Sequence, residues 1–414
     1  MGKAKKIAGS RRSGSKPQSK SSGSASTPST TTTATAQSTA TPDALFSQAQ
    51  SILADTQDPD HPLALLNQSL TQDPSHLPSL ELAATLLLDQ GQAQQAYDLL
   101  SRYHALDSSN PSVELYLGQL SGGHAAVASF RHAVTLLESQ LATAATQEAA
   151  DDMRAKAVDA LCSIAEIYMT DLCFEPDAPD TCLSVLAQAS AIAPANPTPY
   201  LVLASVHISR SAPHDAKAAL VRGLDLWLPA FLHYLTLLGD PEREHELASA
   251  FPDGNPPAIP AFESRLTAVR VCLELGMWGK ALDVLGVCVQ EFDESVDVWY
   301  LFGWTYYLLG EHVQATTAAA PTVEVAGESM PVEMPDAEVM GAREGKKEWW
   351  TSAVECLLRA KALYESGETD EDEGVLAHVQ ELLDKMASEG VFGGEEDEGE
   401  AGEWEDDEED GMKE

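Results

Sequence analysis

One stripe of bulky residues near the end of this chain constrains its fold more than any other feature. A helix brings residues three and four positions apart onto one face, and here that face carries Trp299, Phe302, Gly303 and Tyr306. Three large side chains around a glycine indicate packing against a second helix, because the glycine lets the partner approach closely. Gly310 then ends the helix, as glycine commonly does. The stretch therefore predicts the first helix of a helical hairpin.

The same arrangement recurs upstream at a fixed spacing. Arg265 stands 34 residues before Trp299 and begins another helical pattern, which ends at Gly276 and is followed by Ala281 and Leu285. The two stretches resemble the tetratricopeptide repeat, whose pattern is W-x2-L-G-x2-Y followed by A-x3-F. The resemblance implies two helices per repeat. One repeat cannot bury its apolar face alone, so successive repeats must stack into a superhelix.

Weaker copies of the pattern extend the array toward the N-terminus. Two of their stripes consist of Leu80, Ala83, Ala84 and Leu87, and of Leu161, Ile164, Ala165 and Tyr168. Residues 229–260 fit the pattern least and are expected to form a degenerate pair. We predict an all-α, right-handed superhelical solenoid of about seven tetratricopeptide (TPR) helix pairs. It spans residues 43–388 and ends in a capping helix from Val375 to Met386.

An insertion interrupts the last repeat. The second helix should begin soon after Gly310, yet its matching stripe starts only at Trp350. We therefore place an inserted segment at residues 312–346. Its prolines and acidic residues favour a flexible loop, and a flap that closes over a ligand is the alternative.

Both ends of the chain are expected to be disordered tails. Residues 1–42 are rich in Ser, Thr, Gly and Pro and hold seven basic residues without an acid, while residues 389–414 hold fourteen acids and one lysine. Neither composition can bury a core. A loose basic cluster in the first tail is a candidate nuclear-import signal, with a solubilising tail as the alternative. The cluster consists of Lys3, Lys5, Lys6, Arg11, Arg12 and Lys16.

The charge of the chain points to a cationic partner. The formal net charge is −40, from 65 acids against 25 Lys and Arg. The first tail carries +7 and the last −13, which leaves −34 on residues 43–388. Such a field repels nucleic acid and anionic membranes and attracts basic proteins. The six cysteines form no C-x2-C pair and fit reduced core thiols. Without a signal peptide or a long apolar run, we expect an intracellular, soluble protein.

No catalytic motif accompanies the repeats. The chain lacks G-x4-G-K-[ST], G-x-G-x2-G, H-E-x2-H and G-x-S-x-G, the patterns of phosphate loops, dinucleotide sites, zinc proteases and nucleophile elbows. Its eleven histidines are scattered, and none pairs with a cysteine at zinc-site spacing. We expect no enzyme activity, no metal and no cofactor.

A second stripe on the first helices predicts a binding surface. An α-helix advances about 100° per residue, so Asp297, Tyr300, Trp304 and Tyr307 share a face that points away from the packing stripe. In TPR proteins this face lines the concave surface. The resemblance therefore implies a groove, and its predicted residues are Glu81, Asp89, Asp159, Glu166, Glu263, Glu274, Asp297, Tyr300, Trp304 and Tyr307.

This predicted groove suits an extended basic segment of another protein. Its carboxylates would meet Lys and Arg, and its rings would add cation–π contacts of about 0.5–2 kcal/mol each. Arg270 is the one basic exception in the late repeats. The alternative is that these acids form only a solvated surface. The groove has the wrong sign for the acidic peptide termini that co-chaperones of this fold clamp with Lys, Arg and Asn.

The layout as a whole resembles a group of dedicated chaperones that each escort one ribosomal protein. The similarity is greatest to the TPR chaperones of large-subunit ribosomal protein four, and it rests on the Gly2-Lys3-Ala4-Lys5-Lys6 opening, the repeats and the Trp404–Asp410 acidic run. The resemblance implies a one-to-one complex with that basic client, passage from cytoplasm to nucleus with an import receptor, and no direct contact with nucleic acid or membrane. A histone or other nuclear chaperone, or a scaffold subunit of a larger complex, is the alternative.

Overall fold

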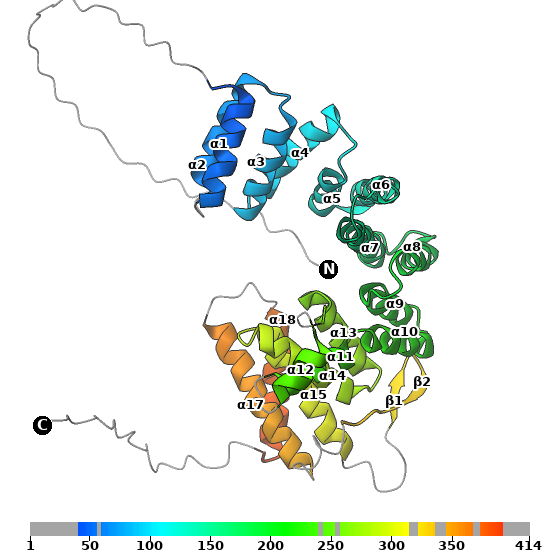
Figure 1. Cartoon of the computed structure of the whole chain (residues 1–414). Helices are drawn as coiled ribbons and strands as arrows, with labels where there is room; N and C mark the ends of the chain where they lie inside the picture. The colour runs from blue at the N-terminus through cyan, green and yellow to red at the C-terminus, as the bar shows by residue number, and fades with distance from the viewer. Residues whose placement is uncertain are drawn as a thin grey trace, which may run out of the picture.

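Paired antiparallel helices make up almost all of the described structure. The computed structural model describes residues 40–55, 59–238, 243–252, 257–313, 322–335, 345–366 and 373–391. The helix pairs stack side by side into a curved array (Figure 1). The helices of this array are α1 (Pro42–Asp55), α2 (Asp60–Gln72), α3 (Leu77–Asp89), α4 (Ala93–Leu106), α5 (Pro111–Leu120), α6 (Gly123–Leu141), α7 (Gln147–Met169), α8 (Ala178–Ile192), α9 (Thr198–Ser209), α10 (Pro213–Asp225), α13 (Phe262–Glu274), α14 (Trp278–Glu291), α15 (Val296–Val313) and α17 (Lys346–Glu365).

These pairs confirm the predicted TPR solenoid. Odd-numbered helices from α1 to α15 are first helices of repeats, apart from α11, and each packs on the helix that follows it in the repeat. The last pair joins α15 to α17. The two halves of a repeat are separated by short turns, and Gly91 and Gly276 adopt φ values of +71° and +70° there. Glycine reaches this left-handed region without the steric cost that other residues meet.

Glycine also permits the close helix contact predicted for the last repeat. A Cβ atom added to Gly303 would lie 2.6 Å from Leu357 Cγ on α17. Helix α15 continues past Gly310 to Val313, so the predicted helix end at this glycine was wrong. A Cβ atom added to Gly310 would lie 2.4 Å from Trp350 Cδ1. Both distances are far shorter than van der Waals contact, so α15 and α17 can approach as they do only because these side chains are absent.

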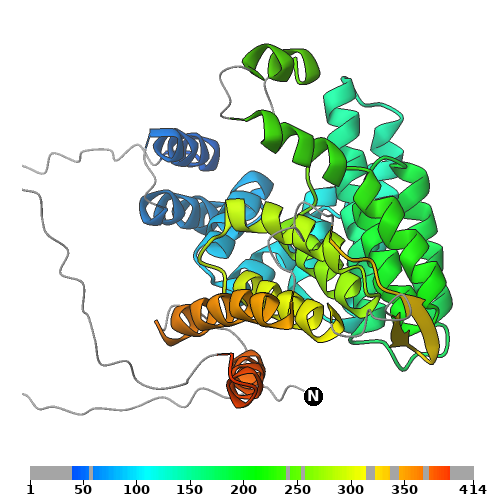
Figure 2. The same ribbon diagram turned by 90° about the horizontal axis from the view of Figure 1, so that it is seen from below.

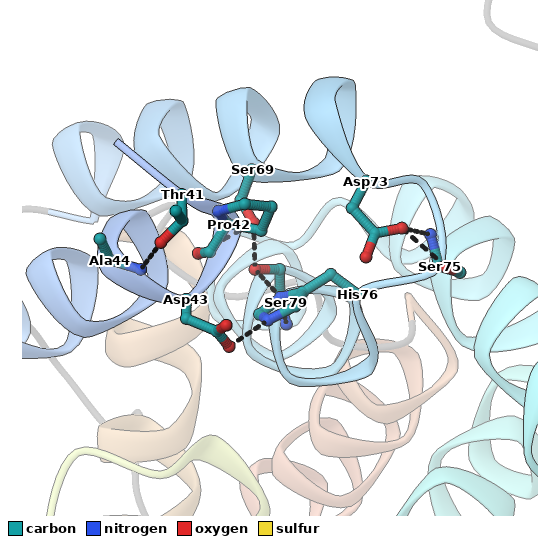
Figure 3. Close-up of polar contacts among 9 residues, drawn as sticks. All are labelled: Thr41, Pro42, Asp43, Ala44, Ser69, Asp73, Ser75, His76 and Ser79. Atoms are coloured by element: carbon teal, nitrogen blue, oxygen red, sulfur yellow. Dashed lines mark hydrogen bonds and ion pairs between the residues drawn. The ribbon is translucent and has the colours of Figure 1, made fainter. Parts of the chain in front are cut away.

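A polar network fixes the first repeat at its N-terminal edge (Figure 3). The Ser79 hydroxyl donates to Ser69 Oγ at 2.9 Å, and both serines are fully buried. Ser69 in turn donates to the Pro42 carbonyl at 3.3 Å, and Nε2 of His76 lies 3.1 Å from Asp43 Oδ1. Buried hydroxyls need such partners, so the network holds the start of α1 against α2 and α3.

The degenerate region forms two helices that leave the stack. These are α11 (Leu228–Leu237) and α12 (Glu244–Ala250), and they project at the top of the view in Figure 2. The array continues past them, because α13 packs directly on α9 and α10. Trp227, 1% exposed, anchors the point of departure in the core. The prediction of a degenerate pair is confirmed, and the pair adds no layer to the solenoid.

The insertion contains a docked β-hairpin, so the expectation of a flexible loop was wrong for residues 322–335. Strands β1 (Thr322–Val325) and β2 (Glu328–Pro331) pair antiparallel, with Val323 opposite Met330. The two turn residues between them have φ values of +52° and +83°, which matches the turn that two-residue hairpins prefer. The rest of the predicted insertion, residues 314–321 and 336–344, lies outside the described residues.

The hairpin docks on the edge of the array where helices of a repeat turn. The Glu333 amide donates to the Gly276 carbonyl at 2.7 Å, and the Gly279 amide donates back to the Glu333 carbonyl at 3.3 Å. The Lys217 ammonium on α10 lies 2.5 Å from the Glu333 carboxylate, and Met330 is 1% exposed. The described part of the insertion therefore seals the α13–α14 turn instead of closing over a groove.

The predicted capping helix is present as α18 (Glu373–Ser388). It covers α15 and α17 with Val379, Leu382, Leu383 and Met386, all at most 5% exposed. A solenoid needs such a cover for its last apolar face. Within the described ranges, no helix is both long and apolar enough to cross a bilayer. The import candidate Lys3–Lys16 and the acidic tail beyond Val391 lie outside the described residues.

Candidate functional site

The first helices line the inner side of the curve. In Figure 1, α5 and α7 face the hollow while their partners α6 and α8 lie on the outside. Shallow clefts separate neighbouring first helices. One cleft runs between α5 and α7, and its polar lining consists of Ser112, Gln119, Lys156, Asp159 and Ser163. The groove was predicted on this inner side of the first helices, and the word groove refers to that surface below.

The two predicted acids on α7 share one face of the helix, and Asp159 lines the cleft between α5 and α7. Asp159 and Glu166 are seven residues apart, about two helical turns, and both side chains are exposed. Even so, desolvation by the surrounding protein raises the pKa of each carboxyl above its usual value, and the charge of Asp159 raises the pKa of Glu166 further. Carboxyls that are accessible but poorly solvated are what a concave wall produces. Because the protein destabilises the ionised form of each carboxyl, a bound cationic ligand would stabilise that form.

The first repeats place a third acid near the groove. Glu81 on α3 is half-buried and accepts a hydrogen bond from Asn110 Nδ2 at 3.1 Å. It lines an apolar cleft together with Phe46 of α1 and Leu82 and Tyr103. Asp89, at the end of α3, is exposed. Glu81 thus has a fixed orientation beside apolar surface, a combination suited to a basic side chain with a long methylene stem.

The two predicted acids of α13 are exposed, and an arginine of the same helix pairs with the predicted acid of α15. Glu263 and Glu274 are exposed at the two ends of the helix, and desolvation raises the pKa of Glu274. Arg270 between them reaches Asp297 on α15, with 2.8 Å between Nη2 and Oδ2. Asp297 is therefore already neutralised. Its role as a client-binding carboxylate stays a prediction, and a basic client would have to compete with Arg270 for it.

The predicted aromatic patch is covered by the capping helix. The Tyr300 hydroxyl lies 2.8 Å from Nδ1 of His378 on α18, and the Trp304 ring meets the same imidazole edge-on at 5.4 Å between centroids. Tyr307 is 7% exposed and stacks on Trp350 at 5.2 Å. Burial raises the pKa of Tyr300 to about 12, with Arg270 acting against the rise and Asp297 adding to it. Tyr300 and Trp304 thus lie half-buried beside α18, whereas Tyr307 is buried, and a role of these rings in client binding stays a prediction.

The acidity of the groove is discontinuous. Helix α9 contains no acid, and the only acid of α5 is Glu114, which is buried. On α7, the Lys156 ammonium lies 2.8 Å from Asp152 within the same helix. The predicted carboxylates that are not neutralised therefore lie on α3, α7 and α13. Helices α5 and α9, which come between them in the array, add no exposed carboxylate.

The sequence of this chain resembles those of known proteins. No family model matches the chain. A protein of Schizosaccharomyces pombe named "Probable assembly chaperone of rpl4" is 28% identical over 292 residues, which are 70% of this chain and 73% of the relative. A protein of Emericella nidulans with the same name is 28% identical over 366 residues, 84% of this chain and 82% of the relative.

A solved structure agrees in fold as well as sequence. The structure of the assembly chaperone of RpL4 (Acl4), residues 1–338, has a TM-score of 0.56 and 28% identity, and the match covers 67% of this chain and 99% of that one. The chain is a TPR solenoid. It is similar over most of its length to proteins named as assembly chaperones of one ribosomal protein.

Two residues of the TPR solenoid's cap were missed by sequence reasoning. His378 contacts Tyr300 and Trp304, and the Lys385 ammonium contacts the Tyr307 hydroxyl and lies 3.4 Å from Glu311. His378 is half-buried next to the apolar residues of an amphipathic helix, whereas the Lys385 side chain is 47% exposed. The position of His378 beside the apolar residues of α18 is the sequence signal that would have linked this helix to the aromatic stripe.

Proposed function

We propose that this protein is a dedicated assembly chaperone that binds newly made ribosomal protein L4 of the large subunit. The observation that carries the proposal is the similarity to Acl4, which spans 99% of that chain in both fold and sequence. The two relatives named for rpl4 assembly support it across 70% and 84% of this chain. The protein acts by binding and carries out no catalysis.

The binding surface that we propose is the acidic part of the groove. Asp159, Glu166 and Glu274 are accessible and poorly solvated, so a Lys or Arg that reaches them replaces a missing water shell. An ion pair in such a setting is worth more than one in open solvent. A basic, extended segment of the client fits this surface best, because it can follow the hollow from α3 to α13.

Occupation of the client's cationic sites protects it. A ribosomal protein that binds RNA exposes Lys and Arg that would otherwise collect stray nucleic acid. The chaperone carries −34 on residues 43–388 and repels RNA. In our proposal the complex has one copy of each protein and enters the nucleus through an import receptor that reads Lys3–Lys16. Ribosomal RNA at the assembly site then competes for the client and displaces the chaperone.

A direct competition experiment tests this function. Purified full-length chain is mixed with purified L4 and with core histones at physiological salt, and the complexes are separated by size-exclusion chromatography. We expect a one-to-one complex with L4 that excess histone does not disrupt. Equal capture of both basic proteins would instead make the chain a general acidic chaperone, and absence of an L4 complex would refute the proposal.

A further inference from the structure

A buried carboxylate lies between two imidazole rings where α4, α5 and α6 meet. The Glu114 side chain, in the first turn of α5, is 2% exposed. Its Oε1 contacts Nδ1 of His104 from the last turn of α4, and its Oε2 lies 3.4 Å from Nδ1 of His132 on α6. The two rings are 6.3 Å apart and nearly perpendicular, at 89°. Three helices from two repeats thus direct ligand atoms to one point.

The repeat pattern does not account for this carboxylate. Glu114 stands four residues before Gly118, as Leu80 stands before Ala84 and Trp299 before Gly303. This position normally carries a packing residue, and Leu80 is fully buried there. A carboxylate that takes such a place loses its water, which destabilises the fold unless strong partners compensate. Glu114 is therefore explained by its partners and not by packing.

The geometry points to a binding site for a divalent transition-metal ion, and we propose that His104, Glu114 and His132 hold zinc or an ion of similar size. The ligand atoms of the three residues all lie within 4.8 Å of one another. Tetrahedral zinc with nitrogen and oxygen ligands at roughly 2.0–2.2 Å places neighbouring ligands about 3.4 Å apart. The contact between His132 and Glu114, at 3.4 Å, already has that spacing.

The exposure of the three ligands also fits a metal site. The His104 and His132 side chains are 45% and 38% exposed, so an ion can enter from solvent and keep a water as its fourth ligand. Two imidazoles and one carboxylate select zinc and its neighbours over calcium or magnesium, which prefer oxygen ligands. The bound ion would join α4 to α5 and α6, and so brace the second repeat against the third.

Sequence spacing predicted no metal site, and the fold shows why. His104, Glu114 and His132 belong to three different helices, and no cysteine accompanies them. Their meeting point exists only after two repeats have stacked. The site is independent of the proposed client, because it depends on none of the groove carboxylates.

Zinc binding by the untagged, full-length chain tests the inference. Protein stripped with a chelator is titrated with zinc chloride in a calorimeter, and with cobalt(II), whose visible spectrum reports four-coordinate geometry. We expect one equivalent of zinc to bind and to raise the melting temperature. His132→Gln should weaken the zinc affinity by more than about tenfold, since loss of a ligand exceeds the loss of a supporting residue.

A matched control separates this site from general histidine binding. His124, 68% exposed, lies 3.3 Å from Glu175 and offers only one histidine and one carboxylate. The His124→Gln variant should still bind one equivalent of zinc, and zinc should raise its melting temperature as much as it raises that of the wild type. The proposal is overturned if the wild type binds no zinc, or if the His104→Gln, His132→Gln double variant binds it as the wild type does. Glutamine keeps a side-chain N–H that can donate to the buried Glu114 carboxylate, so these variants are expected to fold.

Discussion

At the scale of single residues, three carboxyls of the groove are suited to bind a cationic client and also lower the stability of the folded chain. Asp159, Glu166 and Glu274 have raised pKa values because protein replaces part of their water. A carboxyl whose pKa is higher in the folded state than in the unfolded state favours folding when protonated. Ionisation of any of the three costs the folded state stability, because the surrounding protein solvates the charge poorly. A cationic client would relieve that cost, which links client binding to stability.

Charge reversal at three groove positions tests recognition. In Glu81→Lys, Glu166→Lys, Glu274→Lys we expect at least about a hundredfold loss of L4 affinity, since each lost groove contact is worth about 1–3 kcal/mol. Isothermal titration measures it. The matched control is Asp98→Lys, Glu138→Lys, Asp225→Lys, which makes the same charge change on the outer helices α4, α6 and α10. Equal losses in both triple variants would mean that net charge, not the groove, recognises the client.

Neutral substitutions on α7 test the stability cost. Asp159→Asn and Glu166→Gln should each raise the melting temperature at pH 7, because they remove an anion that the folded state solvates poorly. The gain should shrink as the pH falls toward about 4, where the unfolded carboxyls also become protonated. Differential scanning calorimetry from pH 4 to 8 follows both effects. A gain that does not vary with pH, or a gain of the same size in Glu138→Gln on α6, would contradict the desolvation argument.

At the scale of elements, α18 completes the last repeat and covers its aromatic face. The helix buries Val379 and Leu383 against α15 and α17, and His378 reaches the Tyr300 hydroxyl. A TPR array leaves an apolar face at each end. Here α18 covers that end face and also contacts the rings of Tyr300 and Trp304 on α15. A segment of the same chain therefore covers this part of the array.

Undocking α18 tests that account. Val379→Asp with Leu383→Asp places two charges in an apolar contact and should reduce the free energy of unfolding by about 3 kcal/mol or more. Amides of α15 should then exchange faster with solvent, and tryptophan emission should shift to the red as Trp304 becomes wet. Ala377→Asp on the exposed face of α18 is the control. If the double variant melts like the control, α18 contributes no cover and the covered patch must be reconsidered.

At the scale of the whole molecule, charge opposes compaction. The body carries −34 between residues 43 and 388, and in its described part ion pairs such as Lys217–Glu333 and Arg270–Asp297 relieve some of the repulsion among its acids. Self-repulsion of this size destabilises a folded chain and is screened by salt. The same field raises the association rate with a basic client, so stability and client binding respond to salt in opposite directions.

Salt titration tests this opposition. Raising sodium chloride from 20 to about 300 mM shortens the Debye length from roughly 20 to 6 Å. We expect the melting temperature of the free chain to rise and the association rate with L4 to fall by at least about tenfold. Stopped-flow mixing and thermal scans in the same buffers measure both. A melting temperature that is flat or falls with salt would show that self-repulsion is not a significant term.

The sequence by itself determined the array. The spacing of Trp299, Gly303 and Gly310 and its earlier copy at Arg265 predicted paired helices, because helix periodicity and close glycine contacts are local properties. It also predicted that the acids of α3, α7 and α13 lie on a face of their helices apart from the packing stripe. The register of a helix fixes which side chains share a face, whatever lies beyond them.

Only the tertiary structure decided what those side chains meet. Asp297 is paired by Arg270 from the previous repeat, and Tyr300 and Trp304 are covered by a helix more than 70 residues downstream. The hairpin at 322–335 docks on a turn that begins at Gly276. His104, Glu114 and His132 converge from three helices. Each of these contacts joins distant parts of the chain, and periodicity carries no information about such partners, because it describes one helix at a time.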